Sequence, residues 1–299
     1  MVIAKGNPEA PGTILTLLRL GRVSNLPTVW SNVLAGAALS GGVLQPVSTM
    51  MLLSALSLMY IGGMFLNDAL DAEWDRKHGL NRPIPDGEIA RSTVLASAIL
   101  LLLAGQLLIF SLYFFNPERV LFAAVSGAAL ILFIFLYNWS HKWFSHSTWL
   151  MGACRFMIYL TTAAVLGTVT HDLILGGFAL LLYIVGVTYL ARTEYTGEVI
   201  RLWPLFLLFM PLAISGLHVK QSPVTLVFMA LFLVWLIRPL VILLSSDNRK
   251  RPKAVGGMLA AIPLIDASYL AMTGALPQAL LCLMLFFLVL YLHRLIAGT

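Results

Sequence analysis

The sequence predicts an all-α protein, a polytopic transmembrane bundle of nine to ten helices. Of the 299 residues, 60% are hydrophobic and only 11% are charged, whereas soluble domains carry about 25% charged residues. The apolar residues gather in runs of about 20, the length that a helix needs to cross a bilayer. This composition excludes a soluble globular enzyme, a disordered regulator and a nucleic-acid-binding domain.

Charged residues and Pro or Gly clusters divide the chain into ten expected spans. The spans are 24–44, 47–70, 92–115, 119–138, 148–168, 173–192, 202–218, 223–245, 254–273 and 277–296. The breaks are SGG, the charged segment 71–91, NPER, SHKWFSHS, GTVTHD, TEYTGEVIR, HVKQ, SDNRKRPK and TGAL. Residues 13–22 are typical of a short interfacial helix. We therefore expect an N-terminal cytoplasmic segment, 1–23, and a single transmembrane domain, 24–299.

The distribution of positive charge predicts the topology. Cytoplasmic loops of membrane proteins are enriched in Lys and Arg. With the N-terminus in the cytoplasm, that side carries fifteen of the 19 Lys and Arg residues, and the opposite side carries only Arg119 and Lys220. We therefore expect both termini in the cytoplasm.

Cys154 and Cys282 both lie in apolar runs, so the sequence predicts no disulfide framework.

The acidic residues are concentrated rather than scattered. Eight of the 13 fall in the segments 67–89 and 191–201, each of which follows an expected span on the cytoplasmic side. In the first segment Asn67, Asp71 and Asp75 are spaced i, i+4, i+8 and so lie on one face of a helix. Asp68 lies one residue to the side of this stripe.

Both acidic groups are electrostatically unfavourable without a partner. The second group is Glu194 and Glu198, again at i, i+4 spacing. The C-terminal end of a helix carries negative dipole charge, and like charges four residues apart repel. A cation reverses both effects, and carboxylate and Asn carbonyl oxygens suit Mg²⁺ that bridges to phosphate. The alternative is a set of solvated loop charges near the lipid headgroups.

Two adjacent segments resemble a known family. NDALDAEWD followed by NRPIPDGEI is similar to the UbiA-type intramembrane prenyltransferases, whose first motif is NxxxDxxxD with an RPIPxG stretch in the following loop. The resemblance extends to RLGRVSNLPTVWSNVLAG before and within the first span, and to the later acidic pair. It implies a membrane bundle with a lateral opening to lipid. Its implied activity is transfer of a polyprenyl group from an allylic diphosphate, with Mg²⁺ held between the two acidic motifs.

The resemblance and the residue chemistry together give a set of expected site residues. Those expected at the metal are Asn67, Asp68, Asp71, Asp75, Glu194 and Glu198. Those expected at the diphosphate are Arg22, Arg76, Lys77, Arg82, Lys142 and Arg192. Those expected to be catalytic are Asp71, Asp75, Arg155 and Tyr137, where Arg155 is chosen because an ionisable residue inside a span is costly and usually functional.

The sequence also departs from the family pattern. The second motif has Glu where the family has Asp, and Tyr137 is followed by His141 and Lys142 where the family has Lys-Arg. The family has nine spans, whereas ten are expected here. These departures indicate a divergent branch.

Asp266, in the middle of a span, is interpreted either as a partner of Arg238 or as a polar cavity residue.

We therefore expect Mg²⁺-dependent transfer of a prenyl group from a prenyl diphosphate to a small aromatic or lipid-like acceptor within the membrane. The expected partners are these two substrates and the lipid bilayer, without nucleic acid and without an obligatory protein partner. The expected location is the cytoplasmic (inner) membrane of a bacterial cell, with the active site facing the cytoplasm. The alternative function is transport or binding of a lipid-linked phosphate or another anion.

Overall fold

The computed structural model describes residues 13–115, 117–144, 146–196, 203–217, 222–244 and 251–296. Within these ranges the chain is helical, and the connections are turns and loops. The helices of the first half are α1 (Thr13–Leu20), η1 (Val23–Asn25), α2 (Pro27–Leu39), α3 (Pro46–Lys77), α4 (Arg91–Ser111), η2 (Leu112–Phe114), α5 (Pro117–Ser140), α6 (Ser147–Leu166) and α7 (His171–Thr196). Those of the second half are α8 (Trp203–Leu207), α9 (Met210–Leu217), α10 (Thr225–Leu244), α11 (Arg251–Ala260), α12 (Ile262–Met272) and α13 (Leu276–Leu295).

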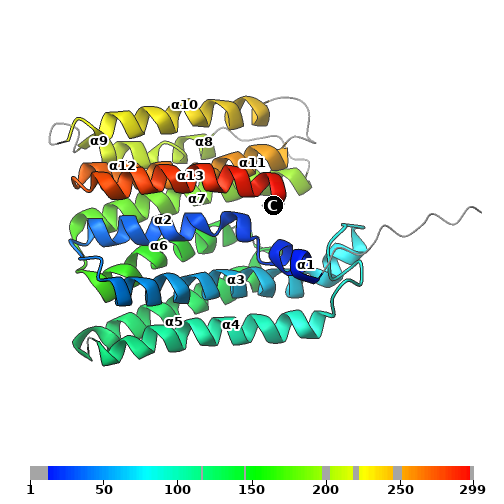
Figure 1. Ribbon diagram of the computed structural model, residues 1–299. Helices are drawn as coiled ribbons and strands as arrows, with labels where there is room; N and C mark the ends of the chain where they lie inside the picture. The colour runs from blue at the N-terminus through cyan, green and yellow to red at the C-terminus, as the bar shows by residue number, and fades with distance from the viewer. Residues whose placement is uncertain are drawn as a thin grey trace, which may run out of the picture.

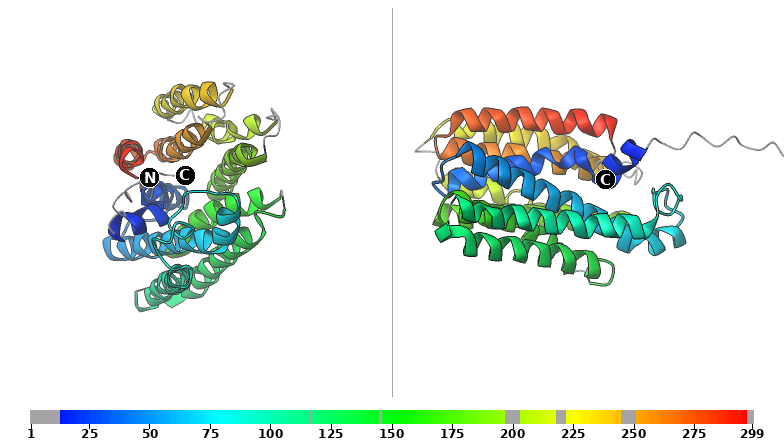
Figure 2. Two further views of the ribbon diagram at one scale, coloured as in Figure 1. Left: turned by 90° about the vertical axis from the view of Figure 1, so that its right-hand side faces the viewer. Right: turned by 60° about the horizontal axis from the view of Figure 1, so that its bottom comes forward.

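The long helices lie side by side and form one bundle, seen from the side in Figure 1 and end-on in the left view of Figure 2. Helices α3, α4 and α5 lie on one side of α2 and α6, and α10, α12 and α13 lie on the other. The buried apolar side chains follow the same division. One large cluster joins residues of α2–α6, and another joins residues of α6, α7, α10, α11, α12 and α13. The all-helical fold class is confirmed.

Among the described residues, eight helices are long and apolar enough to cross a membrane. They correspond to eight of the ten expected spans, with α11 and α12 together forming one of them. The other two expected spans contain shorter helices: α2 has 13 residues, and α8 and α9 fall within the apolar stretch Trp203–Leu217. The multi-pass character is confirmed, and the count of ten remains a prediction.

Two short helices occupy the centre of the bundle. In α12 every residue is buried, and in α2 nearly every residue is buried. A helix that is apolar on all sides lies in a protein core or spans a membrane, and α2 is in the protein core because it packs against α6, α12 and α13. Polar residues on α2 or α12 are therefore far from water and must find partners within the protein.

The interfacial helix expected at residues 13–22 is present as α1, Thr13–Leu20. Ile14 is 76% exposed and Leu17 is 38% exposed, so this helix keeps apolar side chains on its outer face. Leu20 at its C-terminal end is buried in the cluster of the first half. The division into a segment 1–23 and a domain 24–299 remains a prediction.

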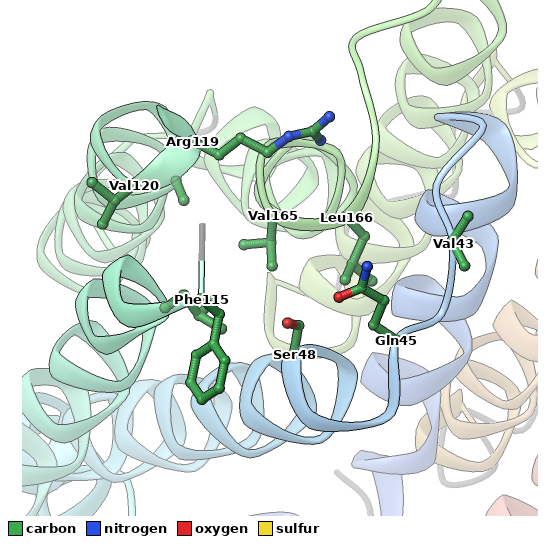
Figure 3. A pocket seen from close by; sticks show the side chains of 10 residues that line it. Val43, Gln45, Ser48, Phe115, Arg119, Val120, Val165 and Leu166 are labelled. Carbon is green, nitrogen blue, oxygen red and sulfur yellow. The ribbon is translucent and has the colours of Figure 1, made fainter. Parts of the chain in front are cut away.

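A cavity of about 220 Å³ lies at the end of the bundle where α3 and α5 begin. It is lined by Leu112 and Ala123 and by eight residues that are labelled in Figure 3: Val43, Gln45, Ser48, Phe115, Arg119, Val120, Val165 and Leu166. The Arg119 guanidinium donates to the carbonyl of Gly167. Because α3 is 32 residues long, or about 48 Å at 1.5 Å per residue, this cavity and the acidic residues lie at opposite ends of that helix.

Close packing of α3 on α4 depends on Gly105. A Cβ atom at this position would lie 2.7 Å from both the carbonyl oxygen of Ala55 and Cγ of Met59. We expect Gly105→Val to destabilise the protein by about 1–3 kcal/mol, because overpacking forces the two helices apart. The midpoint of thermal unfolding in detergent, followed with a thiol-reactive dye on the free cysteines, measures this effect.

Gly216→Val is the matched control for this substitution. A Cβ at Gly216 would meet only Met229 Cε at 3.9 Å, which is ordinary contact distance. An equal loss of stability in the two variants would show that helix propensity, rather than the α3–α4 contact, determines the effect.

Candidate functional site

The C-terminal end of α3 carries the expected metal-binding stripe. Asn67, Asp68, Asp71 and Asp75 all lie on this helix and are at most 8% exposed. The helix ends directly after them, because Gly79 adopts φ +64° and turns the chain away. Two hydrogen bonds that are typical of a helix C-terminus close this end, from Leu80 N to Asp75 O at 3.0 Å and from Gly79 N to Arg76 O at 3.3 Å.

The RPIPDG loop returns a basic side chain to this stripe. Its turns are held by Asp86 N to Arg82 O at 2.9 Å and Gly87 N to Ile84 O at 3.1 Å, and Ile84 is buried beneath the loop. Arg82 Nη1 consequently lies 3.0 Å from Asp68 Oδ1, and Arg82 Nε lies 3.6 Å from Asp75 Oδ2. One guanidinium thus contacts two of the acids.

Arg22 reaches the same acids from the connection between α1 and η1. It is the one non-glycine residue with positive φ within the described ranges, with φ 43° and ψ 45°. This left-handed conformation costs a non-glycine residue about 1–2 kcal/mol. Arg22 Nη2 lies 3.3 Å from Asn67 Oδ1 and 3.6 Å from Asp68 Oδ1. Strained backbone of this kind is concentrated at functional sites.

The C-terminal end of α5 and the turn after it supply a third group of partners. Lys142 Nζ lies 2.7 Å from Asp71 Oδ1, and His141 Nε2 lies 3.2 Å from Asp71 Oδ2. Asn138 Oδ1 accepts a hydrogen bond of 2.9 Å from Asn67 Nδ2. The Tyr137 ring stacks on His141 with centroids 5.2 Å apart, so Tyr137 contacts the site through this histidine.

The electrostatics of the site are those of buried acids matched by basic side chains. Burying a carboxylate costs several kcal/mol unless opposite charge and hydrogen bonds compensate it. Asp68 and Asp71 each have a basic partner within 3.0 Å. Asp75 Oδ2 is buried without a hydrogen bond, and its ion pair with Arg82 is longer. A cation bound beside this oxygen would supply the interaction that it lacks.

Two other expected diphosphate ligands lie away from this group of side chains. Arg76 pairs with Glu73 at 3.5 Å, and both side chains are 59% exposed. Lys77 is exposed at the last residue of α3. On a helix, neighbouring positions point about 100° apart, so residues directly after Asp75 face away from the stripe.

The first residue of the second acidic motif, Glu194, lies near the end of α7. This helix ends at Thr196 on the side of the bundle where α3 ends (Figure 1). Arg192 and Glu194 belong to its last turns, but their side chains are outside the described part of the structure, and Glu198 lies outside the described residues. Among the described residues, no group of three His, Cys, Asp or Glu side chains is placed to hold a metal ion.

Arg155 lies deeper in the bundle and only 9% of it is exposed. Its Nη1 donates to Asn32 Oδ1 at 2.9 Å and its Nη2 donates to Thr28 Oγ1 at 3.0 Å. Its guanidinium also lies 5.8 Å from the centre of the Tyr60 ring. The Tyr60 hydroxyl donates to the carbonyl of Arg22 at 3.4 Å, so Arg155 is linked to the acidic end of α3 through one tyrosine.

Sequence reasoning missed three residues that the structure places in these contacts. Asn138 is next to the expected Tyr137, and Thr28 and Asn32 lie on the first helix of the bundle. All three are polar residues inside or at the end of an apolar run. That signal could have identified them, because such residues are buried at a cost unless they have a partner.

The chemical types of these side chains suit a cation together with an anion. Amide and carboxylate oxygens converge on the end of α3, and Arg22, Arg82 and Lys142 surround them. Oxygen donors of this type bind hard divalent cations, and Arg and Lys bind phosphate oxygens. A phosphorylated ligand that carries a divalent cation fits both sets of groups.

Two curated relatives match part of the chain. Digeranylgeranylglyceryl phosphate synthase from Methanothrix thermoacetophila is 36% identical over 95 residues, which cover 31% of this chain and 36% of that protein. The protein of the same name from Ignicoccus hospitalis is 35% identical over 100 residues, covering 33% of this chain and 32% of its own length. The matched region thus spans about a third of each relative.

Solved structures match over nearly the whole chain. A structure of digeranylgeranylglyceryl phosphate synthase in membranes has a TM-score of 0.60 at 18% identity, covering 88% of this chain and 99% of its own. A UbiA homologue from Archaeoglobus fulgidus, bound to DMAPP and Mg²⁺, has a TM-score of 0.53 at 13% identity and covers 87% and 98%. At these identities the similarity shows a shared fold.

The model of the UbiA prenyltransferase family matches residues 26–256. This range is more than three quarters of the chain and contains the stripe on α3, the RPIPDG loop, the end of α5 and both expected acidic motifs. The resemblance inferred from the motifs is therefore confirmed: the chain belongs to the UbiA prenyltransferase family.

Proposed function

We propose that this prenyltransferase uses Mg²⁺ to transfer a prenyl group from an allylic prenyl diphosphate to a small lipid-like or aromatic acceptor within the membrane. The observation that carries the proposal is the acidic end of α3, where buried Asn and Asp oxygens are surrounded by three basic side chains from other segments. The names of the curated relatives favour the lipid-like acceptor, one of glycerophosphate type.

The donor types on α3 suit a magnesium ion, although the α3 side chains alone do not form a complete site. Asn67, Asp68, Asp71 and Asp75 offer amide and carboxylate oxygens within three helical turns, and Asp75 Oδ2 lacks a hydrogen bond. Glu194 and Glu198 are proposed to complete the site from the end of α7. A metal held there supplies positive charge that stabilises the leaving diphosphate. The solved A. fulgidus homologue bound to DMAPP and Mg²⁺ supports this cofactor.

The basic side chains around the stripe are proposed to bind the diphosphate. Arg22, Arg82 and Lys142 now pair with carboxylates, and each has further N–H donors that can meet phosphate oxygens. Arg76, Lys77 and Arg192 are proposed to act farther out, in the approach of the anion. Tyr137 is proposed to shelter the allylic cation, since aromatic faces stabilise positive charge.

The position of the acids separates this proposal from the alternative of an anion transporter. Transporters place substrate sites near the bilayer midplane on broken helices. Here the acids lie in the last turns of one unbroken 32-residue helix. Diphosphate release from a prenyl diphosphate by purified membranes, with and without Mg²⁺ and candidate acceptors, tests the proposal directly. Release that is absent under all these conditions would favour the alternative.

The protein is an integral, multi-pass membrane protein, and we propose that its site faces the cytoplasm. The excess of Lys and Arg on the side of the acidic motifs supports this orientation. The curated relatives are archaeal, so they give no support to the predicted bacterial membrane. A reporter fused after Ala297 is expected to report a cytoplasmic location. An external location would mean that the orientation is reversed or that the chain has one span fewer.

Asp75→Asn should abolish turnover while leaving the fold intact. The substitution removes a charge and an available oxygen from the stripe, whereas Arg82 keeps its closer partner Asp68 at 3.0 Å. We expect at least a 100-fold loss of kcat with an unchanged midpoint of thermal unfolding, as for the loss of a group that acts through a metal. Turnover and unfolding are measured on the same detergent-solubilised sample.

Glu73→Gln is the matched control on the same helical turn. Glu73 also carries a basic partner, but it is 59% exposed and points away from the stripe. Its turnover should remain at the wild-type level. Loss of turnover in both variants, or loss of folding in Asp75→Asn, would show that the acids act on structure rather than on the reaction.

Glu194→Ala and Glu198→Ala should each raise the Mg²⁺ concentration needed for half-maximal turnover by about tenfold or more, the effect of losing one supporting ligand. Glu194→Asp should be impaired as well, because Mg²⁺ requires oxygens at about 2.0–2.1 Å and the shorter side chain reaches less far. The measurement is turnover against Mg²⁺ concentration. Wild-type curves for both Ala variants would mean that the second acidic pair does not bind the metal.

A further inference from the structure

Asp266 is a completely buried carboxylate outside the site described above. It lies on α12 and is 0% exposed. Asn32 Nδ2 donates to its Oδ2 at 2.8 Å, and the Tyr159 hydroxyl donates to its Oδ1. Of the two interpretations left open by the sequence, the pairing with Arg238 is not found, because Arg238 is an exposed residue of α10 and Asp266 is instead hydrogen-bonded to Asn32 and Tyr159.

The carboxylate determines which way the Asn32 amide points. An amide group has a donor end and an acceptor end. Because the Nδ2 of Asn32 faces Asp266, its Oδ1 faces Arg155 and accepts from Nη1 at 2.9 Å. A reversed amide would set two donors against each other at Arg155. Asp266 on α12 therefore fixes the orientation of the Asn32 amide on α2, and Asn32 in turn presents its oxygen to Arg155 on α6.

The positive charge of Arg155 is a second reason to connect this residue with Asp266. A buried guanidinium is costly without a negative partner, and within the described part of the chain Arg155 makes no direct ion pair with a carboxylate. Asp266 is the acid joined to it, through one amide. Its hydrogen bonds to Asn32 and Thr28 use two of its five N–H donors, and 9% of the residue remains accessible. Arg155 is held in place with its charge still able to attract an anion.

The chain of contacts ends at the candidate diphosphate site. Arg155 lies over the Tyr60 ring, Tyr60 donates to the backbone of Arg22, and Arg22 contacts Asn67 and Asp68. Asp266 lies beyond residues 26–256 that the family model matches. Asp266, in the C-terminal part of the chain, is thus linked to the acidic stripe on α3 through a series of side-chain contacts. The series includes one backbone group, the carbonyl of Arg22.

We propose that Asp266 is a positioning residue for prenyl diphosphate binding: it orients Asn32, and through Asn32 it holds the Arg155 guanidinium toward the diphosphate. This inference rests on the proposed function. The competing explanation is that the same contacts only fasten α2, α6 and α12 together. In that case their loss would lower the stability of the bundle and would leave the KM for prenyl diphosphate unchanged.

A double-mutant cycle on Asp266 and Arg155 tests the inference. Asp266→Leu should raise the KM for prenyl diphosphate about tenfold, a typical effect for residues coupled in one network. In an Arg155→Met background the same substitution should change KM less than twofold, because the group it positions is gone. Asp266→Asn should raise KM less than Asp266→Leu, since its amide oxygen can still accept from Asn32 Nδ2.

Two matched tyrosine substitutions are the control. Tyr159→Phe removes a donor to Asp266 and should raise KM. Tyr183→Phe removes an equally buried hydroxyl that donates to the carbonyl of Met258 at 2.7 Å, and it should leave KM unchanged. If Asp266→Leu does not fold, the cycle is performed with Asp266→Asn, which preserves the shape of the side chain.

Three results are informative. Non-additive changes in KM support the inference. Additive changes, or an unchanged KM in every Asp266 variant of an active enzyme, overturn it while leaving the proposed function intact. Failure of the wild-type protein to release diphosphate from any prenyl diphosphate in the presence of Mg²⁺ overturns the proposed function and this inference with it.

Discussion

The structure of the site depends on one interaction, the pairing of buried carboxylates on the last turns of α3 with cations from three other segments. Asp68 and Asp71 would be destabilising alone at a helix C-terminus within a membrane protein. Arg22 comes from the connection after α1, Arg82 from the loop after α3, and Lys142 from the turn after α5. The same pairing therefore fixes these three connections to one helix end and collects the groups that we propose bind a diphosphate and its metal ion.

Much of this arrangement could be predicted from the sequence, because it follows from spacing along a single helix. The i, i+4, i+8 spacing of Asn67, Asp71 and Asp75 gave their common face, and the apolar runs gave the helical bundle. Arg82 points toward the stripe, whereas Arg76 points away from it. This difference depends on the turns of the RPIPDG loop and could not be inferred from charge alone. Partners far apart in sequence, such as Asn67 with Asn138, depend on how α3 packs against α5. The site roles of all these residues remain predictions.

The two central helices show a different limit of sequence reasoning. Hydropathy indicates that α2 and α12 are apolar, but it does not indicate that they meet. Their burial brings Asn32 to Asp266 across 234 positions of the chain. A polar residue in an apolar run thus signals a partner without identifying it, and only the packing of α2 against α12 identifies that partner. This is why the sequence left Asp266 with two interpretations.

The backbone of Arg22 has a consequence for how this position can change. Its left-handed conformation favours glycine or asparagine, yet its contacts with Asn67 and Asp68 require a long cation. No amino acid satisfies both demands. Any replacement that relaxes the backbone gives up the charge, so under the proposed function a gain in conformational stability at this position would lower activity. Attempts to make this enzyme more thermostable by consensus or glycine substitution should therefore leave residue 22 unchanged.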